Sequence, residues 1–316
     1  MSSLSIRLAS PRKVAGRHGP GNRGSWIRAA LIAVGMGYVA TCAALWERQG
    51  HFIFEPSETL QNSPRDYSFA VEDVAIPISG SHDANELLDG WWIPSSTGST
   101  RTVLYLHGNE GNVSTYVERL DGLRKLGYSV FVIDYRGYGR SGGGFPTETG
   151  VYEDAQAAWN YLVGTRRIAP SNVLIYGHSL GGAIAIELAT HHPEALGLVV
   201  ESSFTSISDM AALDPRYAIL PVSLLLDQRF DSIGKVGSLG LPVMYVHGTQ
   251  DEVVPFAMGR KLFAATPSAV GLVSVAGGGH DDNALKGGSR LLAAVDDFVR
   301  QAPLGVRAAS GPDSIH

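Results

Sequence analysis

The chain has 316 residues, 44% of them apolar and 17% charged, which is enough apolar material for one large core. Its formal net charge of −5 excludes the basic footprint that a nucleic-acid partner would require. Its one cysteine, Cys42, excludes an intrachain disulfide framework and a thiolate-rich metal site, so we expect neither a metal nor another cofactor.

The first segment, residues 1–28, is basic and lacks acidic residues. An apolar run follows over residues 29–46 and ends at Glu47 and Arg48. As a helix rising about 1.5 Å per residue, this run extends about 27 Å, just enough for the hydrocarbon core of a bilayer. The sequence therefore predicts a single-pass signal-anchor. The positive charge before the run predicts that the rest of the chain lies on the non-cytoplasmic side.

Two other fates of this N-terminus stay open beside the uncleaved anchor. Small residues around Ala40, Cys42 and Ala44 offer a cleavage site for signal peptidase, which would release a secreted protein. The arginine- and serine-rich start without acidic residues also suits a mitochondrial presequence.

The segment 51–302 predicts one α/β domain with a mostly parallel sheet and helices on both faces, because stretches of strand length alternate with segments of helical spacing. The first two strands, expected at 71–78 and 86–93, flank a turn and should be antiparallel. The strands of the parallel part are expected at 102–106, 129–133, 172–176, 197–201, 242–246 and 272–275. The helices are expected at 113–126, 149–163, 181–191, 257–265 and 290–301.

Two further segments depart from this alternation. Residues 204–239 contain prolines and apolar clusters, which predicts a small cap over the carboxyl edge of the sheet. Within it we expect Tyr217 and Leu225 to line an apolar pocket for an acyl chain. The tail, residues 303–316, has little apolar content and is expected to be disordered.

A nucleophile motif lies between the strand expected at 172–176 and the next helix. Residues 177–181 read Gly-His-Ser-Leu-Gly, the G-x-S-x-G pattern in its strand-turn-helix context, which predicts Ser179 as a nucleophile. A serine hydroxyl needs a base and a carboxylate behind that base. Asp251 follows the strand expected at 242–246, and His280 follows the strand expected at 272–275. The order serine, aspartate, histidine is the one that such elbows require, so we assign Asp251 as acid and His280 as base.

An acyl transfer also needs two N–H donors for the oxyanion. One should be the backbone N–H of Leu180, which follows the nucleophile. The second should come from the loop 106–112, where Gly108 lets the backbone turn and Asn109 offers its N–H.

These motifs resemble the membrane-anchored serine hydrolases of the α/β-hydrolase fold that include protein depalmitoylases and lysophospholipid lipases. The resemblance covers about residues 51–300 and implies the α/β-hydrolase fold, a serine hydrolase activity and a membrane location. Asn109 departs from the glycine run that lipases and esterases often show there. The matching segments are 52–56, 104–109, 134–141, 146–148, 177–181, 201–206, 247–251 and 279–282.

The function predicted from these residues is hydrolysis of an acyl ester or thioester, with a small-molecule or lipid-like acyl substrate, through an acyl-enzyme. A serine peptidase is an alternative, because the same groups cleave amides. A hydrolase-fold binding protein with vestigial chemistry is a third hypothesis, from a different class. A serine-reactive probe separates the third hypothesis from the other two.

Overall fold

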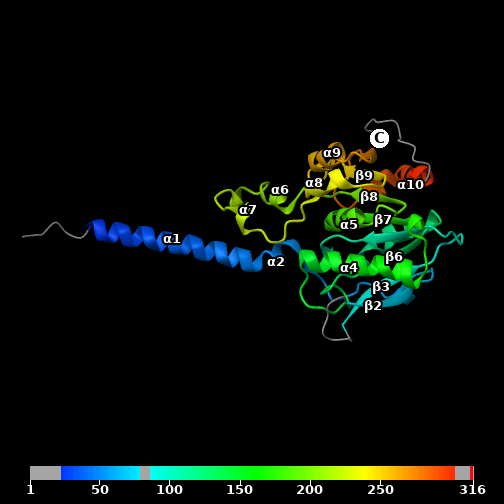
Figure 1. Cartoon of the computed structure of the whole chain (residues 1–316), viewed down its shortest axis with the longest axis horizontal. Coiled ribbons are helices and arrows are strands. Elements are labelled where there is room, and N and C mark those ends of the chain that lie inside the picture. The colour runs from blue at the N-terminus through cyan, green and yellow to red at the C-terminus, as the bar shows by residue number, and fades with distance from the viewer. Residues whose placement is uncertain (1–22, 79–85, 303–313, 316) are drawn as a thin grey trace, which may run out of the picture. The chain divides into compact units, whose positions relative to one another are not determined.

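A computed structural model describes residues 23–78, 86–302 and 314–315. The described residues divide into two compact units, one up to Leu45 and one from Trp46 onward. The first unit is most of helix α1 (Arg23–Arg48). The second unit carries the sheet and the other helices, which Figure 1 labels in chain order.

Helix α1 extends the predicted apolar run at both ends. Its segment Ser25–Arg48 contains an 18-residue window with a mean hydropathy of 1.8, which is largely exposed apart from Cys42. By length and composition this helix is suited to cross a membrane, and a signal sequence near an N-terminus has the same two properties. Residues 23–28, which we placed in the basic segment, belong to this helix too. The rest of that basic segment lies outside the described residues.

The second unit is built on a nine-stranded sheet with the order β11-β10-β9-β8-β7-β4-β6-β3-β2. Strands β2 and β3 pair antiparallel, as do β3 and β6, and the remaining neighbours pair parallel. The fold class predicted from the sequence is therefore confirmed. The strands are β2 (Glu72–Pro77), β3 (Leu87–Ile93), β4 (Thr102–Leu106), β6 (Ser129–Ile133), β7 (Val173–His178), β8 (Gly197–Glu201), β9 (Val243–Gly248), β10 (Ala269–Val275) and β11 (Ser314–Ile315).

Helices cover both faces of this sheet, and Figure 1 shows α4 and α5 running alongside its strands. Residues of α4, α5 and α9 belong to one hydrophobic cluster, and residues of α3 and α10 belong to a second. Strand β4 contributes to both, with Leu104 in the first cluster and Val103 and Tyr105 in the second. Alternate side chains of this buried strand thus pack on opposite faces of the sheet. The helices are α3 (Val117–Lys125), α4 (Glu148–Asn160), α5 (Leu180–His191), α9 (Phe256–Ala265) and α10 (Asn283–Gln301).

The segment predicted as a cap consists of short helical pieces with exposed apolar residues. Leu213, Ile219 and Leu224 are 50%, 79% and 83% exposed. Gln49 holds the segment after its helix α7: the Gln49 side-chain oxygen accepts hydrogen bonds from the backbone N–H groups of residues 227 and 228. Its pieces are α6 (Ile207–Ala211), η5 (Pro215–Tyr217), α7 (Val222–Leu225), α8 (Ser232–Lys235) and η6 (Val236–Ser238).

Two details at the C-terminus differ from the sequence-based expectations. Helix α10 begins at Asn283, seven residues before the expected 290, and Gly288 interrupts it with φ 51° and ψ −136°. Glycine adopts this conformation without a Cβ clash, so helical turns continue on both sides of the kink. Of the tail expected to be disordered, residues 303–313 and 316 lie outside the described residues. Ser314 and Ile315, in contrast, form β11 beside β10.

Candidate active site

Ser179 lies in the sharp turn between β7 and α5. Its backbone has φ 55° and ψ −120°, a conformation that residues with a side chain rarely adopt. The turn is held on both sides: the Ser179 N–H donates to the Glu201 carbonyl at 2.9 Å, and the Ser203 hydroxyl donates to the Ser179 carbonyl at 2.9 Å. The surrounding structure therefore holds the serine in a strained position at the carboxyl edge of the sheet.

Two glycines of the motif are required by close backbone approach. A Cβ on Gly177 would lie 2.2 Å from the Gly181 carbonyl oxygen. A Cβ on Gly181 would lie 2.0 Å from the Leu106 carbonyl oxygen. Both distances are far below van der Waals contact, and both obstacles are backbone atoms that side-chain rotation cannot move. The spacing of the motif thus follows from how tightly the turn packs against β4.

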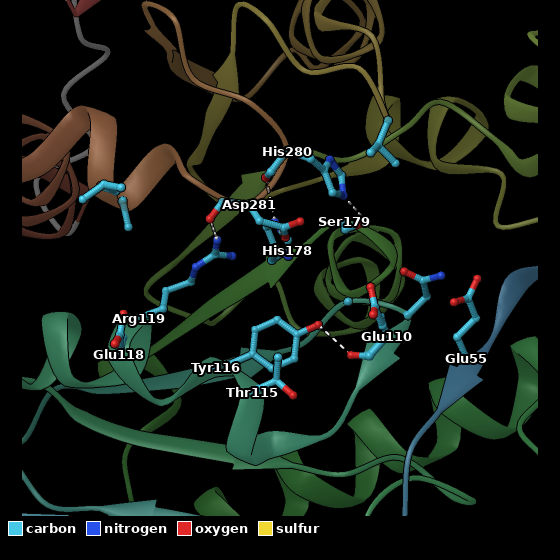
Figure 2. A pocket seen from close by; sticks show the side chains of 15 residues that line it. Glu55, Glu110, Thr115, Tyr116, Glu118, Arg119, His178, Ser179, His280 and Asp281 are labelled. Carbon is cyan, nitrogen blue, oxygen red and sulfur yellow. Dashed lines mark hydrogen bonds and ion pairs between the residues drawn. The ribbon is translucent and has the colours of Figure 1, made fainter. Parts of the chain in front are cut away.

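The structure brings Ser179, His280 and Asp251 together from three separate strand ends. The His280 Nε2 lies 2.9 Å from the Ser179 Oγ, and its Nδ1 lies 2.9 Å from the Asp251 Oδ2. Figure 2 shows the His280 ring reaching over Ser179. Because a carboxylate only accepts, Nδ1 carries the proton in this arrangement and Nε2 is free to accept the serine proton.

Asp251 is fixed and ionised by its surroundings. Its Oδ1 accepts the backbone N–H groups of Val253 and Val254 at 3.0 and 2.8 Å. Its Oδ2 also lies 3.3 Å from the Nε2 of His247, which donates to the Val254 carbonyl at 2.8 Å. Although burial alone would raise it, hydrogen bonds from His247 and His280 hold the pKa of Asp251 well below its usual value.

The two other aspartates near His280 are engaged elsewhere. The Asp281 side chain is 75% exposed, and its Oδ1 lies 3.6 Å from the His178 Nε2. The Asp282 Oδ1 accepts the Gly279 N–H at 2.6 Å and so closes the turn that carries the histidine. Asp251 is therefore the carboxylate in hydrogen-bond contact with the His280 ring.

The loop with Asn109 lies against the nucleophile, next to the first turn of α5. A Cβ on Gly108 would be 3.5 Å from the Ser179 Cβ, so the loop and the serine are in contact. The His107 Nδ1 lies 2.7 Å from the Gly108 carbonyl oxygen, and in a trans peptide the Asn109 N–H points the opposite way. Leu180 is the first residue of α5, where helix geometry leaves the N–H without an intrahelical partner. Leu180 thus adjoins Ser179 in the chain and Asn109 lines the same cavity, and their role as oxyanion donors stays a prediction.

A buried histidine and aspartate support this loop from behind. Burial lowers the pKa of His107 to about 4, so its ring is neutral and donates through Nδ1. Its Nε2 lies 3.6 Å from the Asp134 Oδ1, which accepts the Val113 N–H at 2.8 Å. Burial raises the pKa of Asp134 to about 8, so this carboxyl group is mostly protonated at neutral pH. The pair positions both ends of the loop that carries Asn109.

A cavity of about 650 Å³ opens onto Ser179 and His280, and Figure 2 shows the side chains that line it. Its lining comes from β1 (Glu55–Pro56), β5 (Glu110–Gly111), helix α3 and the turn before α10. Tyr217 and Leu225, expected as acyl-pocket residues, are not among its lining residues. They belong to the cap pieces η5 and α7. Their role as substrate contacts stays a prediction.

Arg119 and Glu201 form a buried pair beneath this cavity that the sequence analysis missed. The Arg119 Nη2 donates to the Asp281 carbonyl at 2.8 Å, and its Nη1 lies 3.9 Å from the Glu201 Oε2. Glu201 also accepts from the Tyr176 hydroxyl at 2.7 Å and from the Asn283 amide at 3.3 Å. The pair joins α3 and β8 to the turn that carries His280. The residues are far apart in sequence, and no local pattern links them.

One group of side chains has the composition of a metal site. The ligand atoms of His178, His280 and Asp281 all lie within 4.8 Å of one another. Both ring nitrogens of His280 already contact Ser179 and Asp251, and the His178 Nε2 lies 3.2 Å from the His280 carbonyl oxygen. A metal ion there would have to displace the Ser179 hydroxyl from His280. The geometry therefore fits the serine chemistry better than a resident metal.

The chain is similar to several known proteins. A family model described as "Serine aminopeptidase, S33" matches residues 98–231. An uncharacterized protein of Mycobacterium tuberculosis is 35% identical over 273 residues, which cover 86% of this chain and 92% of that protein. The alpha/beta hydrolase domain-containing protein 17C of Xenopus tropicalis is 33% identical over 192 residues, which cover 60% of this chain and 59% of that protein.

Solved structures agree on the fold. An esterase of Pyrococcus furiosus superposes with a TM-score of 0.64 at 22% identity, covering 79% of this chain and 98% of that one. An α/β-hydrolase of Vibrio vulnificus superposes with a TM-score of 0.57 at 24% identity, covering 75% and 81%. At these identities the likeness concerns the fold alone.

Proposed function

Because the chain belongs to the α/β-hydrolase family, we propose that it is a serine hydrolase that cleaves acyl esters or thioesters of lipid-like substrates. Ser179 is the nucleophile, His280 the general base and acid, and Asp251 the residue that orients the histidine. The observation that carries this proposal is the continuous path of two 2.9 Å contacts from Asp251 through His280 to a strained serine that faces a cavity.

The proposed reaction has two halves. The Ser179 Oγ attacks the acyl carbonyl carbon while its proton passes to the His280 Nε2, and the N–H groups of Asn109 and Leu180 stabilise the oxyanion. The tetrahedral intermediate collapses, the bond from carbon to the alcohol or thiol breaks, and His280 returns the proton to that leaving group. Water then attacks the acyl-serine with His280 again as base, which releases the acid and restores the hydroxyl.

This function is tested with a fluorophosphonate probe and a substrate panel on the purified protein. We expect covalent labelling and hydrolysis of p-nitrophenyl esters from acetate to palmitate, together with acyl thioesters. Aminoacyl p-nitroanilides test the alternative of a peptidase, since the matched family model is described as a serine aminopeptidase. Faster turnover of the anilides than of every ester would move the assignment to a peptidase. Absence of both labelling and turnover would favour a binding protein.

We also propose that α1 is an uncleaved anchor that holds the catalytic unit at the non-cytoplasmic surface of a membrane. The helix is long and apolar enough to span a bilayer, and the charges before it are positive. The cap exposes Leu213, Ile219 and Leu224, which agrees with a position of the catalytic unit close to lipid.

We predict that the full chain stays in the membrane fraction after a carbonate wash and that its N-terminus is intact. Alkaline phosphatase fused after His316 should be active, and a fluorescent protein that folds only in the cytoplasm should be dark there. Glu47→Gln, which changes a charge after the run, is the matched control and should leave the orientation unchanged. A mature N-terminus at or after Ala43, or a bright fluorescent fusion, would contradict the anchor or its orientation.

A further inference from the structure

The cavity beside Ser179 is strongly acidic. Its lining includes four exposed carboxylates, which Figure 2 labels: Glu55, Glu110, Glu118 and Asp281. Within the described residues, no lysine or arginine forms an ion pair with the three glutamates. Clefts lined by one sign of charge focus the electrostatic field and concentrate ligands of the opposite sign.

The single arginine of the lining does not offset these carboxylates. The Arg119 side chain is only 12% exposed, and its Nη1 lies 3.9 Å from the Oε2 of the buried Glu201. Its remaining donors go to the Tyr105 hydroxyl at 3.2 Å and the Asp281 carbonyl at 2.8 Å. Arg119 and Glu201 together are neutral, so the exposed carboxylates leave the mouth of the cavity negative.

Two of the glutamates are placed side by side by the backbone. Strands β1 and β5 pair in parallel with Glu55 opposite Glu110, directly beside the loop that carries Asn109. Like charges on directly opposed strand residues repel and destabilise the pairing. A positively charged ligand between them would remove that repulsion, whereas an anionic ligand would increase it.

His178 provides an independent observation at the cavity floor. Its Nε2 lies 3.2 Å from the His280 carbonyl oxygen, an acceptor, so Nε2 carries the proton. Burial and the neighbouring Arg119 and His280 lower the pKa of His178 well below its usual value, so the ring is neutral. Its Nδ1 is then an acceptor, and it is buried without a hydrogen-bond partner.

The unpartnered Nδ1 lies among residues that line the cavity next to the nucleophile. The point where a side chain on Gly108 would begin lies 3.5 Å from the His178 Nδ1, 3.1 Å from the Tyr116 hydroxyl and 3.5 Å from the Ser179 Cβ. A buried acceptor without a donor costs free energy that a ligand with a donor would recover. A ligand group that donates a hydrogen bond at this part of the cavity lining would satisfy the Nδ1, close to where the leaving group departs from Ser179.

We propose that the preferred substrates are acyl esters whose alcohol carries a positive charge, and most of all an ammonium with an N–H. This inference rests on the proposed function. The carboxylates attract the cation to the mouth, and the His178 Nδ1 accepts its N–H. The reaction is the acyl transfer described above, in which His280 protonates the departing cationic alcohol.

The test compares three butyrate esters that differ in charge and in donors. Choline carries a quaternary ammonium, 2-(dimethylamino)ethanol carries a protonated tertiary ammonium, and 3,3-dimethylbutanol is the neutral isostere of choline. At neutral pH and about 10 mM salt we expect kcat/KM at least about tenfold higher for both cationic esters than for the neutral one. The tertiary ammonium should be the best of the three. At about 0.3 M salt the advantage should shrink several-fold, because exposed charges are screened.

Variants assign the effect to the cavity. The double change Glu55→Gln and Glu110→Gln should bring the ratio of cationic to neutral kcat/KM close to one. Glu194→Gln, an exposed carboxylate after α5 at the opposite end of β8, should keep the full ratio. The salt series on the unmodified protein gives the answer even when the double variant does not fold.

The outcomes separate this inference from the proposed function. Equal kcat/KM for all three esters at low salt, with the neutral ester turned over, overturns the cationic preference and leaves the serine hydrolase intact. A quaternary ester preferred over the tertiary one overturns the role of the His178 Nδ1. Absence of fluorophosphonate labelling and of turnover of any ester overturns the proposed function, and the cationic preference with it.

Discussion

Replacing Ser179 with alanine is expected to lower kcat by about 10⁴- to 10⁶-fold, because the acyl-enzyme can no longer form. Alanine meets the same steric limits as serine at φ 55°, so the turn should keep its shape without the hydroxyl. The backbone contacts of the turn to Glu201 and Ser203 do not involve the lost Oγ. Single-turnover and steady-state kinetics on p-nitrophenyl butyrate measure the loss, and fluorophosphonate labelling should disappear with it.

The control for this prediction is Ser238→Ala. Ser238 is exposed, and its hydroxyl bonds the Lys235 carbonyl within the same helical turn. We expect unchanged turnover and labelling in this variant. Turnover above about one hundredth of the original rate in a pure, folded Ser179→Ala protein would show that another group is the nucleophile.

Sequence predicted most reliably what is encoded over a few consecutive residues. The elbow at 177–181 is encoded locally, because its glycines are required by close backbone contacts within the turn and against β4. The structure has the elbow in the expected place, between β7 and α5. The strands were found because both faces of the sheet are buried, which leaves continuous apolar runs bounded by turn residues. The structure confirms the fold, and the comparisons confirm the α/β-hydrolase family.

The candidate site was harder to predict because its supports come from distant parts of the chain. Asp251 and His280 could be chosen because each follows a strand end, and the carboxyl ends of parallel strands share one edge. No such rule exists for Arg119 and Glu201, which meet through the packing of α3 against β8. The cavity wall formed by Glu55 was also missed, since a two-residue strand gives no periodic signal.

The pocket residues show a different limit. Tyr217 and Leu225 were chosen because an apolar segment follows a strand end near the nucleophile. The apolar side chains of such a segment can face the core, the solvent or a membrane, and composition does not choose among these. In the structure the neighbouring Ile219 and Leu224 are exposed, and the cavity at Ser179 is lined by other elements, which contribute both carboxylates and apolar side chains such as Val253 and Leu285.

Asp251→Asn is expected to lower kcat by about 10³- to 10⁴-fold through the wrong histidine tautomer. The Oδ1 position accepts two backbone N–H groups, from Val253 and Val254, so the asparagine oxygen will occupy it. The asparagine NH₂ must then face the His280 Nδ1, 2.9 Å away, and donate to it. With Nδ1 as acceptor, the proton of the neutral ring moves to Nε2, which can no longer accept the proton of Ser179.

Asp282→Asn is the matched control, because it makes the same chemical change at a neighbouring carboxylate. The Asp282 Oδ1 accepts the N–H of Gly279, three positions earlier in the chain. An asparagine oxygen can accept that N–H too, so kcat should stay within about tenfold. Steady-state kinetics on a neutral ester with both purified variants, checked for folding by circular dichroism, decides between the carboxylates. Near-normal turnover in Asp251→Asn together with collapse in Asp282→Asn would show that Asp282 orients His280. Collapse in Asp251→Asn alone would identify the carboxylate whose hydrogen bond sets the tautomer.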